Sequence, residues 1–584
     1  MMFALLPHLR PILLGGSSEV FAPIPGLGNL AFYTDFTQGT LVPQVGPTWS
    51  ITRATTSTTV DFEGLVRPIL SGEARFRGLR RVENGVATTS EDFSNAAWTK
   101  ISATITGGIS DPLGGSNART FTATAGSASV SQAAAGNAVT GATYRSTFYI
   151  KRRTGTGSVF LRAATGSDQD VTAAVTSSWR RVTVSGLAPD TTRRIMVKLA
   201  TSGDEVDIFG AQSEDTSGQA ITAPSEYVSR GVLSTPWHGA GVDGVKYFAT
   251  ANGNTVASNV VTEATGAALT LTGDVGIRPF GAATHIGIHN RDLTNAAWVK
   301  GATATVAKDQ TGADGVANGA SSFTGGAVGA TNTVLQTVTL ASSSRAFETY
   351  IQRLVGTGTV EMTTDNGTTW VDITSSITSG WTKVRIPAQT VTNPVFGFRI
   401  TTLSDKIAVD YITNTSVVDA PVIGTTTAAV TVNADVVTAD GAGVINATEG
   451  TLWVESVGPV SSAERVVFGA DDGTSSKVFG LSQSLTARGG RGFIVNTGTQ
   501  MSQAVGAYAA GATSKNALMY KLNDSNIAFD GTAGTDDVAC TVPAATTFRL
   551  GYITSGSEAD TTIRKAAYSI VRASNANAAT ATSP

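Results

Sequence analysis

Features that most globular sequences have in abundance are scarce in this chain, and each scarcity excludes a class of protein. Cys540 is the only cysteine among 584 residues, so neither an intrachain disulfide nor a cysteine-rich metal site can form. Charged residues make up 15% of the chain, against roughly 25% in an average soluble protein. The net charge of −3 supplies no basic field that would attract nucleic acid. We therefore expect no nucleic-acid partner, and folding in a reducing cytoplasm is consistent with the single thiol.

Long hydrophobic runs are also missing. No stretch of about 18 consecutive apolar residues occurs, so we expect no membrane insertion. The apolar start of the chain is interrupted by Pro7, Arg10 and Pro11 and lacks a basic leading segment, which makes it a poor signal peptide. Such a segment is suited to docking in extended form on a partner, and we therefore predict an extended N-terminal arm.

A sustained helical period is the third absence. Thr, Ser, Ala and 64 Gly replace the missing charge, which is the composition of short strands joined by tight turns. Segments such as 144–151 and 194–200 are rich in β-branched or aromatic residues, and turn residues bound them. Strand candidates follow one another at intervals of roughly 8–15 residues, a spacing typical of antiparallel sandwiches. The predicted fold class is all-β, with tandem antiparallel β-sandwich (jelly-roll) domains and the extended arm.

An internal repeat is the strongest pattern that is present. The stretch Asp92-Phe-Ser-Asn-Ala-Ala-Trp98-Thr-Lys100 returns as Asp292-Leu-Thr-Asn-Ala-Ala-Trp298-Val-Lys300, and further echoes follow at nearly the same offset. One building block has therefore been used twice. Residues kept in both copies should maintain the block, while residues found in one copy are freer to have local roles. We predict core packing for the four repeated tryptophans, Trp98, Trp179, Trp298 and Trp381.

The repeat and the shifts in composition divide the chain into seven parts. These are an N-terminal arm (1–40), a β-rich preamble (41–90), the first sandwich (91–230), a connector (231–290), the second sandwich (291–420), a linker (421–445) and a third sandwich with a frayed, low-complexity tail (446–584).

Three parts of the chain carry a resemblance to a known family. The string from Trp49 to Thr55, then Ala74-Arg75-Phe76, then Ser90 to Trp98, resembles a preamble common in tailed-bacteriophage tail-fibre and other virion structural proteins. The repeated block resembles a carbohydrate-binding-module-like sandwich, and residues 446–584 resemble a laminin-G or concanavalin-like jelly roll.

The second copy departs from this pattern, which puts a ligand site there in doubt. Gly210-Ala-Gln212 becomes Tyr411-Ile-Thr413, and the turn at Tyr227 has no clear counterpart.

The resemblance implies a bacteriophage virion structural protein, most plainly a tail fibre or tail-associated adhesin that binds a host-surface glycan or other receptor. It implies that the arm anchors the chain to other virion proteins, that the chain is a homotrimer, and that it is assembled into the particle in the host cytoplasm. Two alternatives stay open: a capsid head fibre, decoration or baseplate subunit without a receptor role, and a polysaccharide-depolymerising tailspike.

Residues with binding chemistry are few. Trp370 follows the turn at Asp365-Asn-Gly367 and would offer its ring to a sugar, although a half-buried strand tryptophan is the commoner outcome. Arg488 and Arg491 lie in an expected basic turn that would meet an anionic glycan, against the simpler interpretation of a solvated loop. The other receptor-binding residues are unknown at this stage.

Catalytic and metal sites are not predicted. Glu205 and Asp207 share one face of an expected strand, whereas glycosidases need two carboxylates on opposite sides of a cleft. His285 and His289 are four residues apart, but their neighbours are typical of a strand and not of a metal-binding helix. We therefore expect no enzyme, no metal and no cofactor.

Overall fold

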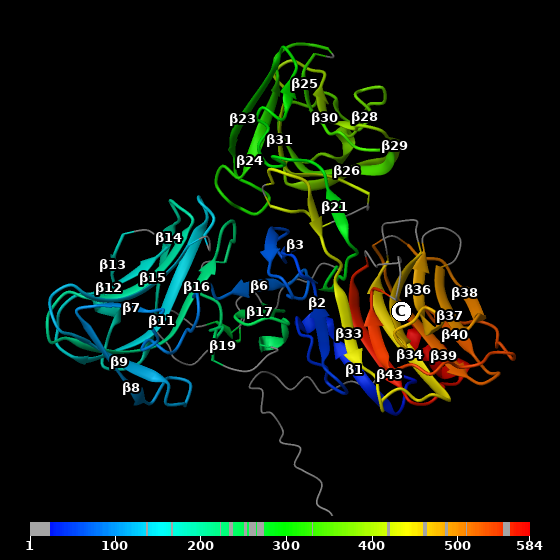
Figure 1. Cartoon of the computed structure of the whole chain (residues 1–584), viewed down its shortest axis with the longest axis horizontal. Coiled ribbons are helices and arrows are strands. Elements are labelled where there is room, and N and C mark those ends of the chain that lie inside the picture. The colour runs from blue at the N-terminus through cyan, green and yellow to red at the C-terminus, as the bar shows by residue number, and fades with distance from the viewer. Residues whose placement is uncertain are drawn as a thin grey trace, which may run out of the picture.

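The computed structural model of the chain describes residues 24–135, 138–164, 167–221, 224–232, 237–249, 254–255, 264–265, 274–329, 331–416, 421–424, 426–458, 464–484, 489–509, 511–552 and 561–584. Nearly all regular structure in these residues is β-strand in antiparallel sheets, which confirms the predicted fold class. Three β-sandwich lobes surround a central region that we call the hub, formed by the described residues of 53–90 and 224–290 (Figure 1). The first sandwich lies at the left of Figure 1, the second at the top and the C-terminal sandwich at the right.

The first sandwich consists of two five-stranded sheets, in the orders β13-β12-β15-β10-β7 and β14-β11-β16-β9-β8. Its strands are β7 (Thr99–Ile101), β8 (Ala103–Ile109), β9 (Ala118–Ala123), β10 (Ala128–Ala135), β11 (Thr143–Thr154), β12 (Val159–Ala163), β13 (Gln169–Asp170), β14 (Arg180–Leu187), β15 (Thr192–Leu199) and β16 (Glu205–Asp215).

The second sandwich has the same topology, strand for strand, in the orders β28-β27-β30-β25-β22 and β29-β26-β31-β24-β23. Its strands are β22 (Val299–Lys300), β23 (Ala304–Gln310), β24 (Ala320–Gly325), β25 (Thr333–Thr337), β26 (Ser343–Val355), β27 (Val360–Thr363), β28 (Val371–Asp372), β29 (Thr382–Val391), β30 (Val395–Ile400) and β31 (Lys406–Thr415). A short 3-10 helix follows β13 and another follows β28, at Thr172–Ala174 and Thr374–Ser376. The sequence repeat is therefore a structural repeat.

Alternation along the strands gives each repeated sandwich its core. In β12, Val159, Leu161 and Ala163 are buried, while the residues between them are partly exposed. Successive side chains of a strand point to opposite faces, so this pattern buries one face of the sheet. Burying a large aliphatic or aromatic side chain contributes roughly 1.5–3 kcal/mol.

The C-terminal sandwich is assembled from widely separated parts of the chain. Its sheets have the orders β41-β40-β39-β34-β43-β20-β5, with β1 also paired to β43, and β2-β33-β42-β35-β36-β37-β38. The strands are β1 (Leu30–Asp35), β2 (Trp49–Thr52), β5 (Phe76–Arg77), β20 (Gly276–Ile277), β33 (Val436–Asp440), β34 (Glu449–Val457), β35 (Arg465–Asp471), β36 (Lys477–Ser484), β37 (Gly489–Asn496), β38 (Thr499–Val505), β39 (Thr513–Lys521), β40 (Asn526–Phe529), β41 (Thr532–Ala533), β42 (Thr547–Leu550) and β43 (Ile563–Ser569).

This assembly differs from the extended arm predicted for residues 1–40. In the described part of that range, β1 is a strand of the C-terminal sandwich, and Phe32 and Phe36 are fully buried. The pairing partner of β1 lies more than 500 residues further along the chain, so no local pattern shows it. Residues 1–23 of the predicted arm lie outside the described residues.

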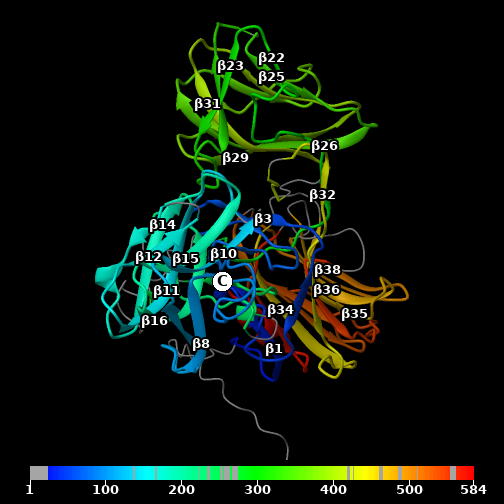
Figure 2. The ribbon, with the colours of Figure 1, turned by 60° about the vertical axis from the view of Figure 1, so that its left-hand side comes forward.

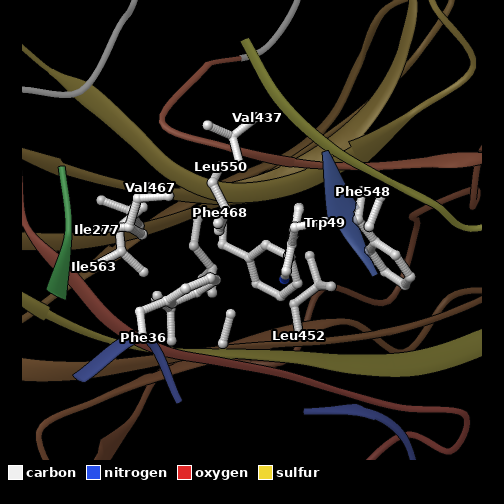
Figure 3. Close-up of a cluster of buried hydrophobic side chains, with 14 of the residues drawn as sticks. Phe36, Trp49, Ile277, Val437, Leu452, Val467, Phe468, Phe548, Leu550 and Ile563 are labelled. Carbon is white, nitrogen blue, oxygen red and sulfur yellow. The ribbon is translucent and has the colours of Figure 1, made fainter. Parts of the chain in front are cut away.

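Figure 3 shows how these separate segments meet in one core. Trp49 of β2 lies beside Phe468 of β35, with Phe548 of β42 nearby. Phe36 and Ile277 belong to the same cluster, although they come from the beginning and the middle of the chain. The Trp49 indole Nε1 donates to Thr34 Oγ1 at 3.0 Å, so its one polar group is satisfied. The lobe therefore needs its N-terminal strands for a complete core.

The C-terminal tail also differs from the prediction. In place of a frayed segment, residues Asn575–Thr582 form α1, with Ser574 as its N-cap and with Ala578 and Ala581 buried. The Trp453 indole Nε1 donates to the Ala581 carbonyl at 2.9 Å. Small alanine side chains let the helix pack closely on the sheet, and tertiary packing stabilises a helix that its low-complexity sequence does not predict.

The hub joins the three lobes. It contains the hairpin β3 (Ser57–Val60) with β4 (Val66–Ile69) and the pair β6 (Arg80–Glu83) with β17 (Val245–Phe248). Two short strands, β18 (Asn254–Thr255) and β19 (Ala264–Thr265), also pair. The second sandwich is joined to the rest by the ribbon of β21 (Ala283–His285) and β32 (Val430–Val432), visible in Figure 2 below β26.

Buried ion pairs hold the hub to the C-terminal sandwich. Arg53 and Arg75, the two arginines of the preamble motif, both contact Asp435, at 2.5 and 2.9 Å. All three side chains are almost fully buried, and removing the shared carboxylate would leave two uncompensated buried cations. The preamble motif therefore has a structural role.

Arg67 of the hub hairpin links the two repeated sandwiches to each other. Its Nη2 donates to the Ser217 carbonyl of the first sandwich at 2.8 Å, and its Nη1 donates to the Asp314 carbonyl of the second at 3.4 Å. Asp61 balances its charge with a contact of 2.8 Å.

Candidate functional site

The repeated Asn-Ala-Ala-Trp motif builds the same turn in both sandwiches. The indole of Trp98 donates to the Thr89 carbonyl at 3.0 Å, and the indole of Trp298 donates to the His289 carbonyl at 3.1 Å. Both rings are 1% exposed and belong to the two sandwich cores. These tryptophans are unable to contact a ligand, since the fold encloses them.

The lysine that ends the motif caps that turn. Lys100 Nζ donates to the carbonyls of residues 94 and 95, at 2.8 and 2.6 Å. Lys300 Nζ makes the equivalent bonds to residues 294 and 295, at 3.0 and 2.6 Å. The lysines therefore also serve the scaffold.

The repeated arginine and Gly-Thr-Gly motif forms a second shared unit. Arg152 contacts Asp204 at 3.2 Å and donates to the Gly157 carbonyl at 2.8 Å, while the Gly157 amide donates to Asp204 at 2.8 Å. The second copy repeats the three contacts at 3.2, 2.8 and 2.6 Å with Arg353, Gly358 and Asp405. Retention of this motif is explained by folding alone.

The other repeated tryptophans, Trp179 and Trp381, were predicted to lie in the sandwich cores, but the structure places them outside those cores. Trp179 and Trp381 are half-buried, and each joins a small cluster on the outer face of its sheet. Lys151 Nζ lies 5.0 Å from the centre of the Trp179 ring. Repetition identifies them as structural positions, but it carries no information about which face of the sheet is covered.

Trp370 lies in the second sandwich just before β28, and its ring is not a free platform. The Arg399 guanidinium carbon is 4.3 Å from the ring centre, in a cation–π contact. Glu361 holds that guanidinium with a contact of 2.5 Å. A sugar that stacked on this face would have to displace the arginine.

Arg491 lies within strand β37 and not in a turn. It pairs with Glu464, and its Nε and Nη2 donate to Ser502 Oγ at 3.1 and 2.8 Å. Its guanidinium is therefore already engaged. Arg488 lies outside the described residues.

The carboxylates Glu205 and Asp207 are paired within their own sheet. Asp207 contacts Lys151 at 3.1 Å and Arg153 at 3.7 Å, and Glu205 contacts Arg153 at 3.4 Å. Thr120 and Thr122 donate to them at 2.8 Å each. This is an ion-pair ladder on a sheet face, and both carboxylates lie on the same strand, β16.

The described histidines, cysteine and carboxylates do not form a metal centre. No group of three or more His, Cys, Asp or Glu side chains in the described part of the chain could hold a metal ion. His285 is buried in β21, and burial lowers its pKa to about 3, with Lys383 and Arg345 acting in the same direction. None of the described helices is long and apolar enough to span a bilayer.

The structures of the two sandwiches differ at the place where their sequences differ, namely Gly210-Ala-Gln212 in the first copy and Tyr411-Ile-Thr413 in the second. Gly210 and Tyr411 occupy the same bulge, with φ of 59° and 48°. A side chain on Gly210 would meet the rings of Tyr149 and Tyr227, because Tyr227 fills that space from a separate segment. The ring of Tyr227 lies 6.2 Å from Tyr149, and the ring of Tyr411 lies 6.3 Å from Tyr350. The ring of Tyr227 therefore has a counterpart in the ring of Tyr411, although Tyr411 belongs to strand β31 and not to an equivalent turn.

The polar partners of these tyrosines differ in chemistry. Tyr227 bonds to Ser90 at 2.6 Å and donates to Glu91 at 3.1 Å, and burial raises the pKa of both the Tyr227 hydroxyl and Glu91. Tyr411 donates to Asp314 at 2.9 Å and stacks 4.1 Å from the Arg291 guanidinium. Against the effect of burial, Arg291 holds the pKa of Asp314 below its ordinary value.

A cavity of about 430 Å³ lies between the hub and the second sandwich. One side is formed by strands β3 and β4 of the hub together with β5 and residues 274–280, which lie within the hub ranges and also extend a sheet of the C-terminal sandwich. Strands β26 and β29 with residues 421–422 form the other side. Five cationic side chains line it, namely Arg75, Arg77, Arg278, Lys383 and Arg385. Sequence reasoning did not identify this site, because its walls come from segments that are far apart in the chain.

The charges of this cavity are only partly balanced. Lys383 contacts Glu348 at 3.0 Å, and Arg77 and Arg278 share Asp274. Arg385 is exposed and has no carboxylate partner among the described residues. The arrangement favours an anion.

A second cavity, of about 350 Å³, lies between the hub hairpin and both sandwiches, and its arginines are paired. Arg67 contacts Asp61 at 2.8 Å, and Glu83 contacts Arg81 at 3.0 Å and Arg193 at 4.0 Å. The first cavity is therefore the better candidate for ligand binding.

Comparison with known proteins returned solved structures only: no family model and no curated protein matches the chain. The chain is similar over 23% of its length to Trypanosoma rangeli sialidase, at 14% identity and a TM-score of 0.20, and this covers 22% of that chain. It is similar over 26% of its length to domain 4 of AbnA, a GH43 extracellular arabinanase from Geobacillus stearothermophilus in complex with arabinotriose, at 10% identity and a TM-score of 0.22, covering 77% of that chain. It is similar over 57% of its length to the CBM22-1-CBM22-2 tandem domain of Xyn10C from Paenibacillus barcinonensis, at 11% identity and a TM-score of 0.17, covering 97% of that chain. At these TM-scores the similarities carry no functional argument, and the fold rests on the strand pairing described above.

Proposed function

We propose that this chain is a bacteriophage virion protein, a tail fibre or tail-associated adhesin, that binds a host-surface glycan without catalysing a reaction. The observation that carries the binding role is the cation-lined cavity between the hub and the second sandwich. Ligand sites are commonly concave, lie between domains and combine apolar walls with a few polar groups. This cavity has all three properties.

The carboxylates of the cavity support a binding role over a catalytic one. Asp274 is paired with two arginines, and Glu348 is paired with Lys383. A glycosidase needs one carboxyl group as acid and another as base or nucleophile, set across the sugar. The lining groups are arranged instead as fixed charges that would hold a ligand.

The virion assignment rests on the preamble motif and on how the lobes are joined. Arg53 and Arg75 of that motif anchor the hub to the C-terminal sandwich through Asp435. Three lobes on one hub present several surfaces outward (Figure 2). The N-terminal region, predicted above as an arm over residues 1–40, is the proposed attachment to other virion proteins, and a homotrimer would multiply weak binding by avidity.

Electron microscopy of intact virions labelled with an antibody against this chain tests the location. Label on the tail supports the proposal, and label confined to the capsid would overturn the tail assignment. Light scattering on the purified full chain tests the trimer. Binding of labelled full chain to host cells tests recognition, and release of soluble saccharide from host polysaccharide would show an enzyme instead.

A further inference from the structure

We propose that the 430 Å³ cavity between the hub and the second sandwich binds a sugar that carries an anionic group, a carboxylate or a phosphate. This inference rests on the proposed glycan-binding function and adds the class of ligand and the groups that recognise it. Figure 1 shows β3 in the central hub below the second sandwich, and residues of β3 and β26 line the two sides of the cavity.

Arg75 provides an unsatisfied buried donor on the cavity wall. Its Nε contacts Asp435 at 2.9 Å and its Nη1 donates to the Thr58 carbonyl, while its Nη2 is buried with no hydrogen-bond partner in the structure. The whole residue is 4% exposed. A buried guanidinium nitrogen without an acceptor is costly, so a ligand oxygen at this position would remove a penalty already present in the fold.

Arg385 supplies a second guanidinium from the opposite side. It lies on β29, is exposed and has no ion-pair or hydrogen-bond partner for its side chain among the described residues. Arg77, 32% exposed at its side chain, adds a third guanidinium beside Asp274. Guanidinium groups pair well with carboxylate and phosphate oxygens, because their N–H donors match the spacing of two oxygens.

The remaining walls suit the body of a sugar. Thr58 and Thr59 each donate their hydroxyl hydrogen to a carbonyl, at 2.7 Å, so their oxygens are left as acceptors for ligand hydroxyl groups. Phe280 and Tyr350 add aromatic surface. The cavity volume falls within the range of roughly 300–1,000 Å³ typical of small-ligand sites.

The first sandwich lacks two of the charged residues of this site, which argues that these two charges are not part of the shared scaffold. At the positions of Glu348 and Arg385 it carries Thr147 and Thr183. Over the equivalent sheet face, Arg181 Nη1 donates to the Ser225 carbonyl at 2.5 Å. The space that is open in the second copy is therefore closed in the first by residues 225–228.

Isothermal titration of the full chain at low salt tests the site, with glucuronic acid, glucose 6-phosphate, inorganic phosphate and glucose as four separate probes. We expect one or both acidic sugars to bind, glucose not to bind, and inorganic phosphate to bind more weakly than glucose 6-phosphate. Binding of the acidic sugars should weaken as salt rises, because the cavity is open to solvent.

Arg385→Gln should weaken binding roughly tenfold, the loss expected for one charge-assisted hydrogen bond. Arg194→Gln on β15 of the first sandwich is the matched control and should leave binding unchanged. Since Arg385 is exposed, its variant should unfold at the same temperature as the native chain, which separates loss of binding from loss of folding.

The inference would be overturned by no binding of either acidic sugar, by equal binding of glucose, or by native affinity in Arg385→Gln. Equal affinity for inorganic phosphate and glucose 6-phosphate would also overturn it, by showing that the sugar is not recognised. If the full chain binds host cells but no acidic sugar, this site fails while the proposed function stands. If acidic sugars bind but host cells do not, the site stands and the proposed function fails.

Discussion

The two repeated sandwiches have one strand order and one set of turn contacts, yet the outer faces of their second sheets differ. In the first copy, Tyr227 and its neighbours seal that face against Tyr149. In the second, Tyr350 and Lys383 line an open cavity against the hub. A scaffold that tolerates two coverings of the same face lets one copy serve folding while the other lines the cavity proposed as a ligand site.

The comparison also shows one packing problem solved in two ways. Both copies place a tyrosine ring at the bulge. In the second copy the ring is that of Tyr411, on the bulged strand itself, and in the first it is that of Tyr227, from a segment that follows the last strand. Where the ring comes from Tyr411, a residue other than glycine adopts a left-handed φ, at a cost of about 1–2 kcal/mol. The hydrogen bond to Asp314 and the stacking on Arg291 offset this cost.

Removing the shared tryptophan should have the largest effect, and an equal one in the two copies. Trp98→Ala and Trp298→Ala should each destabilise their own sandwich by roughly 3–5 kcal/mol, because each deletion leaves a large cavity in a core. Thermolysin protection along a urea series, read by mass spectrometry of the released peptides, measures the two lobes separately. A strong effect in one copy alone would contradict the structural equivalence.

Substitution of Tyr411 tests whether the packing of its ring outweighs the cost of its left-handed backbone conformation. Tyr411→Gly should destabilise the second sandwich by about 2–3 kcal/mol, since the lost ring packing outweighs relief of the left-handed backbone. Tyr411→Phe is the control that removes only the hydroxyl and should cost about 1 kcal/mol. The same protection assay reads both variants, and a Tyr411→Gly chain as stable as the native one would refute the argument.

Loss of the aspartate should have the same effect in the two arginine–aspartate units, Arg152–Asp204 and Arg353–Asp405. Asp204→Asn and Asp405→Asn should each cost about 1–2 kcal/mol, and the two values should agree within about 0.5 kcal/mol, because the contacts are nearly superimposable and far apart. Urea unfolding of each lobe gives both values. A clear difference between them would show that the surroundings of the two loops, and not the shared unit, determine their stability.

Acid should distinguish the copies through His285, because the equivalent stretch of the first copy, residues 84–87, contains no histidine. The pKa of His285 is lowered from 6.5 in the unfolded chain to about 3, so between these values the unfolded chain binds a proton that the folded chain does not. The stability contributed by the neutral ring is complete above pH 6.5 and falls below it by about 1.4 kcal/mol per pH unit. Lys383 and Arg345 are the cations that face it.

Unfolding of the second lobe measured from pH 7 to pH 4 checks this slope. His285→Gln should flatten it. An unchanged slope in His285→Gln would mean that another group controls the acid sensitivity of this lobe.

Local patterns predicted much of the fold because they report local physics. Alternation in β12 and the repeated turn at Asn95 and Asn295 depend on residues close in sequence. The covering of a sheet face does not, which is why Trp179 and Trp381 lie outside the cores expected for them. The tail helix α1 was missed for the same reason, since packing on a distant sheet stabilises it.

The candidate site shows most clearly what local sequence patterns are unable to predict. Arg75 stood in a motif that suggested a family, and nothing around it in the sequence indicates an orphaned guanidinium nitrogen. Arg385 was visible only as a charge that the first copy lacks. Trp370 and Arg491, chosen for their residue types, proved to be engaged by Arg399 and Glu464.

The sequence by itself determined the all-β class, the doubled block and the residues that maintain it, because strand alternation and tight turns are written in neighbouring residues. Only the tertiary structure decided that the N-terminal strands complete the C-terminal sandwich and that a cation-lined cavity opens beside one copy of the repeat. Both depend on contacts between segments tens to hundreds of residues apart, where the packing of the whole chain determines which groups meet and which remain unpaired.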